Sequence, residues 1–133
     1  MATPPAPFPL VAVLDARRGE VYVQRFTADR SPDGPPHAAT PADAAAEVEA
    51  RSWLVGTGGP LLMPHFEPGL VAGQAAIAPD AGGVARAAAA HLGRGVVPIS
   101  GFQLTPVYLR EPDARPMTTV RIPGAEAAHP GGP

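Results

Sequence analysis

The first strong hydrophobic pattern in the chain is the uninterrupted apolar run from Leu10 to Leu14. A short run of this kind is typical of a central strand that is covered on both faces. The charged turn DARRGE follows it, and Gly19 can adopt the positive φ that a tight turn needs. From Glu20 to Thr27 β-branched and aromatic residues are frequent, which favours an antiparallel return strand. The pattern therefore predicts a β-hairpin.

Capping signals predict a first helix after this hairpin. Thr40 offers an N-cap hydroxyl, Pro41 occupies the first helical position, and Asp43 lies three residues after the cap. The helix is predicted to run to about Arg51. Its inward-facing positions are expected to be Ala44, Ala45 and Val48.

A second helix has the clearest pattern in the chain. Asp80 is placed to cap the segment AGGVARAAAAHL, and Gly93 and Gly95 follow it, as is typical of a helix end. A spacing of four places three apolar residues on one face of this helix: Val84, Ala88 and Leu92.

Short segments between and after the helices predict further strands. A strand is expected around His37–Thr40, within the loop 28–39, and another at Trp53–Val55, where a glycine turn ends it. Leu61–Phe66 suggests one helical turn, and the stretch GLVAGQAAIAP contains an edge or parallel strand. The last extended segment is expected at Thr105–Arg110, where two prolines indicate an edge position or a crossing over the surface.

This order of elements indicates the fold class. Two or three antiparallel strands are followed by strands that helices connect, which predicts an α/β unit with a mixed sheet and helices packed on it. A single lobe of the ribonuclease-H-like fold has this order of strands and helices.

Composition and charge limit the size and the kind of protein. The 133 residues suit one domain. Residues 1–9 and 113–133 are rich in proline, alanine and glycine and are expected to be flexible, which leaves residues 10–112 as the folded lobe. The net charge is −2 and the ten arginines are scattered, so no basic stripe for nucleic acid is expected.

The absence of cysteine excludes disulfide scaffolds and thiolate metal sites. The N-terminus lacks the pattern of a signal peptide, and no apolar run reaches the length of a membrane span. A cytoplasmic protein is therefore the expectation.

Asp15, at the end of the first strand, is the first candidate for chemistry. Together with Glu20 it could hold a metal ion in a nuclease or small hydrolase, but such a site needs two or three converging oxygen donors. Asp29 is the remaining acid nearby, and it lies in a loop beyond the return strand. The favoured interpretation is that Asp15 accepts backbone hydrogen bonds in the turn and pairs with Arg17 or Arg18.

The glycine-rich segment Gly56–Pro60 is a second candidate, because its backbone N–H groups could bind a phosphate. It lacks the lysine and hydroxyl of a P-loop and the spacing of a dinucleotide site. A turn after a buried strand is the simpler interpretation, and a vestigial nucleotide site stays as an alternative.

Two tyrosines, Tyr22 and Tyr108, lie in segments that resemble strands. Each is expected to bury its ring and hydrogen-bond its hydroxyl. Replacing either with alanine is expected to lower stability by about 2–4 kcal/mol, the cost of deleting a buried aromatic side chain.

Three phrases together, VAVLDARRGEVYVQRF, LVGTGG and TPVYLREPDA, resemble the second half of the TsaB (YeaZ) family over about Val11 to Ala114. The family's phrases have the form DAR.GEVY, GdG and P.YLR. The resemblance implies two tandem lobes of the actin/Hsp70-like ATPase superfamily. It also implies a non-catalytic partner of TsaD, the catalytic subunit that places threonylcarbamoyl on adenosine 37 of tRNA. Older naming calls the group glycoproteases.

The family's first lobe opens with a strand of the type ILaiDTS and contains a segment GpGsFTGlR, and neither is present here. The chain thus resembles the second lobe alone. Its expected partners are a TsaD-like subunit or the missing first lobe, with a homodimer through an apolar face as an alternative. No cofactor, metal or catalytic residue is expected. The resemblance gives a structural role to the motif residues Asp15, Arg17, Gly19, Glu20, Tyr22, Gly56, Gly58, Pro106, Tyr108, Leu109 and Arg110.

Overall fold

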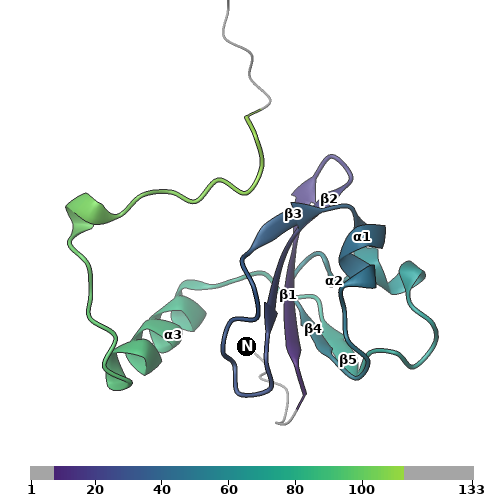
Figure 1. Ribbon diagram of the computed structural model, residues 1–133, viewed down its shortest axis with the longest axis horizontal. Coiled ribbons are helices and arrows are strands. Elements are labelled where there is room, and N and C mark those ends of the chain that lie inside the picture. Colours follow the sequence, from purple (N-terminus) through teal and green to yellow (C-terminus); the bar gives the residue numbers. More distant parts are fainter. Residues whose placement is uncertain (1–7, 113–133) are drawn as a thin grey trace, which may run out of the picture.

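A five-stranded mixed sheet forms the centre of the computed structural model, which describes residues 8–112 (Figure 1). The strands are β1 (Leu10–Arg17), β2 (Glu20–Phe26), β3 (His37–Ala39), β4 (Trp53–Val55) and β5 (Gly73–Ala75), in the order β3-β2-β1-β4-β5. Residues 1–7 and 113–133, which fall in the two terminal segments expected to be flexible, lie outside the described residues.

Strands β1 and β2 form the predicted antiparallel hairpin, in which Val13 pairs with Val23. The register shifts between Asp15 and Arg17, and the turn that follows uses three consecutive residues of positive φ. Gly19 has φ +76°, as expected, but Arg17 and Arg18 adopt the left-handed region as well, at 65° and 54°. The turn therefore places strain on two residues that carry side chains.

The other strands extend this hairpin in both directions. β3 pairs with β2 antiparallel, whereas β4 pairs with β1 in parallel and β5 pairs with β4 in parallel. The predicted mixed sheet is confirmed, including the strand around residue 37 and the parallel edge strand after Gly69. Within the described residues no helix is long and apolar enough to cross a membrane.

One face of the sheet carries the hydrophobic core. Helix α1 (Pro41–Ala46) and helix α2 (Gly59–Leu62) pack against it, and the short 3-10 helix η1 (Met63–His65) packs against these two helices. The core is formed by Val11, Val13, Val21, Val23, Ala44, Ala45, Val48, Leu54 and Leu62. The three inward positions predicted for the first helix are all buried.

Helix α1 begins as predicted, because the Thr40 hydroxyl accepts a hydrogen bond from the backbone N–H of Asp43. Its predicted end near Arg51 is wrong, since the helix stops at Ala46. Arg51 has φ +64°, and this reversal of the backbone directs the chain into β4. The helix-favouring composition of residues 44–50 is therefore overridden by the connection to the sheet.

The opposite face of the sheet is not covered by α1 or α2. Paired residues on neighbouring strands point to the same side of a sheet, so the register places one apolar set here. We call it the open sheet face; its partly exposed members are Leu10, Ala12, Leu14, Tyr22, Phe26 and Trp53.

Helix α3 (Ala81–Gly93) forms where predicted, with the Asp80 carboxylate accepting a hydrogen bond of 2.6 Å from the N–H of Gly83. It does not pack on the sheet as the other helices do. It lies apart, on the side opposite α1 and α2 (Figure 1). Val84 and Leu92, on the predicted apolar face, are 64% and 54% exposed.

The chain continues through a short 3-10 helix, η2 (Gly101–Gln103), and then returns to the hairpin. The extended segment predicted at residues 105–110 forms no ladder with the sheet, and only its end approaches β1 and β2. Pro106 has no N–H to donate, which is consistent with a segment outside the sheet.

Candidate functional site

Asp15 closes the turn at the end of β1. Its carboxylate accepts a hydrogen bond of 2.8 Å from the N–H of Arg17, and its own N–H donates to the hydroxyl of Thr57 at 3.1 Å. The first contact is the local bond by which an aspartate stabilises a turn. The second fixes the hairpin end against the loop after β4.

Glu20, the other carboxylate of the hypothetical metal pair, is held by a guanidinium group. Arg110 Nη1 lies 3.1 Å from Glu20 Oε2 and donates a second hydrogen bond of 3.1 Å to the carbonyl of Ala16. Both charged side chains are only partly exposed, 25% for Arg110 and 35% for Glu20. This carboxylate is thus engaged by a positive charge from the far end of the chain.

Asp29, the remaining acid of the metal hypothesis, lies in the loop after β2. Its carboxylate hydrogen-bonds to the hydroxyl of Thr27 and to Ser31, and these contacts lower its pKa below the usual value. Within residues 8–112, no three histidine, aspartate or glutamate side chains come close enough together to hold a metal ion. The described residues therefore fit a stabilised turn better than a cation site.

The loop Gly56–Gly59 packs closely against the end of β1. Gly56 has φ +112°, and a Cβ there would lie 2.1 Å from the carbonyl oxygen of Val13. A Cβ at Gly58 would lie 2.8 Å from a methyl carbon of the same valine. The glycines are therefore required by close packing with the strand.

Three of the four backbone N–H groups that this loop could offer to a phosphate are already used. Gly56 donates to the carbonyl of Ala75 at 3.0 Å, and Gly58 donates to the carbonyl of Val13 at 2.9 Å. Gly59 donates back to Gly56 at 3.3 Å. A bound phosphate would have to displace these bonds, so the loop fits a structural turn.

The two tyrosines do not have the same environment. Tyr22 is partly buried on the open sheet face, where it pairs with Leu14 on one side and with Ala38 on the other. Tyr108 is 82% exposed, so the expectation of a buried ring is wrong for this residue. In the C-terminal phrase Leu109 and Arg110 are the partly buried residues, and Arg110 makes the contact with the hairpin.

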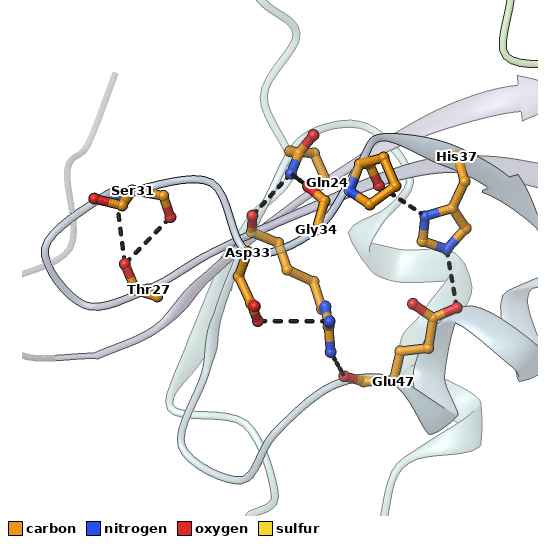
Figure 2. Close-up of polar contacts among 9 residues, drawn as sticks. Gln24, Thr27, Ser31, Asp33, Gly34, His37 and Glu47 are labelled. Atoms are coloured by element: carbon orange, nitrogen blue, oxygen red, sulfur yellow. Dashed lines mark hydrogen bonds and ion pairs between the residues drawn. The ribbon is translucent and has the colours of Figure 1, made fainter.

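A cluster of polar contacts joins β2, the following loop and the end of α1 (Figure 2). Arg25 pairs with Asp33 at 3.5 Å, and Gln24 donates to the carbonyl of Gly34 at 2.7 Å. His37 Nε2 lies 2.9 Å from a carboxylate oxygen of Glu47. We did not expect this cluster, because its residues follow no motif along the chain.

The pKa of His37 is raised by its contact with Glu47 and, secondarily, by the hydrogen bond between its other ring nitrogen and the carbonyl of Pro35. The contact connects the edge strand β3 to the residue that ends α1. Its geometry indicates a stabilising link between a strand and a helix.

Beside this cluster a cavity of about 250 Å³ opens near the start of β1. Its wall includes Arg25, Asp33, Glu49 and the buried Ser52. Arg25 and Asp33 are paired with each other, which leaves the carboxylate of Glu49 as the remaining charged group of the wall.

Two solved structures from Pseudomonas aeruginosa have a similar fold. A protein described as similar to the peptidase YeaZ matches with a TM-score of 0.61 at 24% sequence identity, and YeaZ itself matches with 0.61 at 23%. The matches cover 77% and 76% of this chain and 49% of each solved chain. No protein-family model and no curated protein matches. The fold is therefore YeaZ-like, and the chain spans about half the length of those proteins.

Proposed function

We propose that this chain is a non-catalytic lobe of the TsaB type that supports a TsaD-like catalytic subunit in forming N6-threonylcarbamoyladenosine at position 37 of tRNA. One observation carries the proposal. The two phrases that resemble the family most specifically meet in a YeaZ-like fold, through the contact of Arg110 with Glu20 across 90 residues of sequence.

The contacts of the motif residues support a non-catalytic role for this chain. Asp15 stabilises a turn, Glu20 receives Arg110, and Gly56 and Gly58 allow close packing on β1. Each contact accounts for its residue without a substrate. The same proposal places this chain in the cytoplasm, where tRNA is modified.

The matches to the solved structures cover only one part of those proteins. The matched structures are about twice as long, so this lobe corresponds to about half of each of them. We propose that this lobe acts in tRNA modification together with a TsaD-like subunit or with a first lobe of the TsaB type.

Reconstitution with the purified TsaD-like subunit of the same organism, and the other enzymes of the modification, tests the proposal. Adding this chain should stimulate the modification of tRNA, and omitting the TsaD-like subunit should abolish it. Asp15→Asn and Glu20→Gln should keep the stimulation, because both preserve shape and hydrogen bonding. The proposal would be refuted if tRNA modification reached its full extent without this chain and did not change when the chain was added.

The rival proposal is a metal-dependent nuclease or small hydrolase that uses Asp15 and Glu20. The same variants distinguish it, because losing either carboxylate should abolish a metal-dependent reaction. RNA cleavage that needs Mg²⁺ or Mn²⁺ and disappears in Asp15→Asn would favour the rival. We expect no cleavage, because Glu20 is already paired with Arg110.

A further inference from the structure

The cavity near the start of β1 lies at the end of the hairpin opposite to Asp15. The start of β1 and the end of β2 supply apolar side chains to its wall, among them Pro9, Val11 and Phe26. Within the described part of the chain, none of the motif residues lines it. The cavity is therefore separate from the turn and the glycine loop considered above.

Ser52 is a buried polar residue of this wall, only 1% exposed. Because side chains alternate along a strand, it points to the same face of the sheet as Leu54, two positions later. Its backbone N–H donates to the carbonyl of Glu49, and its carbonyl accepts from Ala72. Its hydroxyl makes no hydrogen bond within residues 8–112. Buried hydroxyl groups normally have a partner, so this one is available to a ligand.

The nearest acid of the wall comes from the same turn of the backbone. The N–H of Ser52 lies 3.2 Å from the carbonyl of Glu49, and Arg51 between them has φ +64°. The first and last Cα atoms of such a turn lie within about 7 Å of each other. Glu49 is exposed and Ser52 is buried. One short turn thus supplies a carboxylate at the outer side of the cavity and a hydroxyl at its inner side.

The charges around the cavity favour a cation. Arg25 and Asp33 of the wall are paired at 3.5 Å (Figure 2), whereas the carboxylate of the turn has no ion pair within the described residues. Two further arginines contact Phe8: Arg30 donates to its carbonyl at 2.8 Å, and the guanidinium of Arg51 lies 5.5 Å from the centre of its ring. A carboxylate and a serine oxygen both accept hydrogen bonds, which suits a ligand rich in N–H donors.

We propose that this cavity binds a primary ammonium group on a short apolar stem. The Glu49 carboxylate and the Ser52 hydroxyl accept hydrogen bonds from the ammonium, and the stem lies against Val11 and Phe26. The volume of about 250 Å³ corresponds to about eight water molecules at about 30 Å³ each. This volume is enough for a stem of about four carbons.

Two sources have this chemistry, a free small amine and a lysine side chain of another protein. The chain contains no lysine, so no lysine of its own or of a second copy supplies the group. The inference does not depend on the tRNA-modification proposal, because none of the motif residues takes part in it. Either proposal can therefore fail without the other.

Titration of the full chain with butylammonium, followed by NMR of the backbone amides, tests the inference. The amides of Val11 and Ser52 should shift at millimolar concentrations, since a ligand this small makes few contacts. The neutral 1-butanol and the anion butyrate have a stem of similar length without the positive charge. Both should bind at least about tenfold more weakly, because they lose the ion pair with Glu49. Potassium chloride at the same concentration controls for ionic strength.

Nα-acetyl-lysine methylamide distinguishes the two sources. It carries the same ammonium on a four-carbon stem, joined to a stretch of peptide backbone. Binding tighter than that of butylammonium assigns the cavity to a lysine side chain, and weaker binding assigns it to a free amine. Either result supports an ammonium site.

Substitutions identify the two acceptors. Ser52→Ala and Glu49→Gln should each weaken the binding of butylammonium by about tenfold, because each removes an acceptor from a charged donor. Glu67→Gln is the matched control, since Glu67 is an exposed glutamate outside the wall, and it should leave the binding unchanged. Without ligand, Ser52→Ala should keep the melting temperature of the parent chain, because its hydroxyl has no partner to lose.

The inference is overturned if butylammonium does not shift the amides of the cavity, or if 1-butanol, butyrate or potassium chloride shifts them equally. It is also overturned if Ser52→Ala and Glu49→Gln bind as the parent chain does, or if Glu67→Gln weakens the binding as much. A Ser52→Ala chain that melts at a lower temperature and still binds would assign the hydroxyl to the stability of the fold alone.

Discussion

Arg110 and Glu20 lie 90 residues apart in sequence, and the guanidinium Nη1 of the first lies 3.1 Å from the carboxylate Oε2 of the second. The same nitrogen donates to the carbonyl of Ala16, next to the bulge that ends β1. One arginine therefore connects the segment after η2 to both strands of the hairpin. The contact limits where this segment can lie, because it fixes the segment at residue 110.

Replacing Arg110 with alanine should release the segment around residue 110 from the hairpin. We expect a loss of about 1 kcal/mol in the free energy of unfolding, because the lost bonds are charge-assisted but partly exposed to water. The clearer effect should be local. Limited proteolysis near residues 105–112 should accelerate while β1 and β2 stay protected.

Arg94→Ala is the matched control for that experiment, since Arg94 follows α3 and has an exposed side chain. It removes the same charge without touching the hairpin. Equal acceleration of proteolysis in both variants would mean that net charge, and not the contact with Glu20, restrains the segment.

Replacing each of the two tyrosines with alanine should lower the stability by different amounts. Tyr108→Ala should change stability by no more than about 0.5 kcal/mol, because an exposed side chain loses little on deletion, and this ring is 82% exposed. Tyr22→Ala should cost about 2 kcal/mol, since its ring is partly buried against Leu14. Urea unfolding of both variants measures the difference, and equal costs would contradict it.

A glycine can be required by a positive φ or by the close approach of another group. Gly19 and Gly56 allow these two reasons to be compared. Gly19→Ala should cost about 1 kcal/mol, because only its positive φ is unfavourable for alanine and nothing lies within 4 Å of the added methyl. Gly56→Ala should cost more than 2 kcal/mol, because the methyl would meet the carbonyl of Val13 at 2.1 Å. Thermal unfolding ranks them; a smaller effect at Gly56 would show that the loop shifts freely.

Local chemistry explains why the hairpin could be predicted from the sequence. The apolar run, Gly19 and the β-branched return strand all lie within about twenty residues, and the bond of Asp15 to Arg17 spans only two positions. The N-caps of α1 and α3 were predictable for the same reason, since each capping bond spans three positions.

Tertiary contacts explain what the sequence did not predict. The stop of α1 at Ala46 depends on the turn at Arg51 into β4, which the composition of the helix does not reveal. The apolar periodicity of α3 predicts a buried face, whereas Val84 and Leu92 on that face are more than half exposed. The contact of His37 with Glu47 joins two elements whose proximity only the folded sheet creates.

The contact of His37 with Glu47 should make stability depend on pH near neutrality. Hydrogen bonding to Glu47 raises the pKa of His37 above the value near 6.5 of the unfolded chain. A raised pKa means that the folded state favours the protonated imidazole. The contribution to stability is therefore complete below about pH 6.5 and is lost as the pH rises through the pKa of the folded state.

His37→Gln should remove this dependence. Its stability should fall below that of the parent chain at pH 6 and approach it at pH 8, with a difference of no more than about 1 kcal/mol because both side chains are more than a third exposed. Glu47→Gln should have the same effect, and the double variant should add little to either single change. Urea unfolding at pH 6 and pH 8 measures all four chains. A difference that grows with pH would mean that His37 is neutral in the folded state and that its contact with Glu47 is not an ion pair.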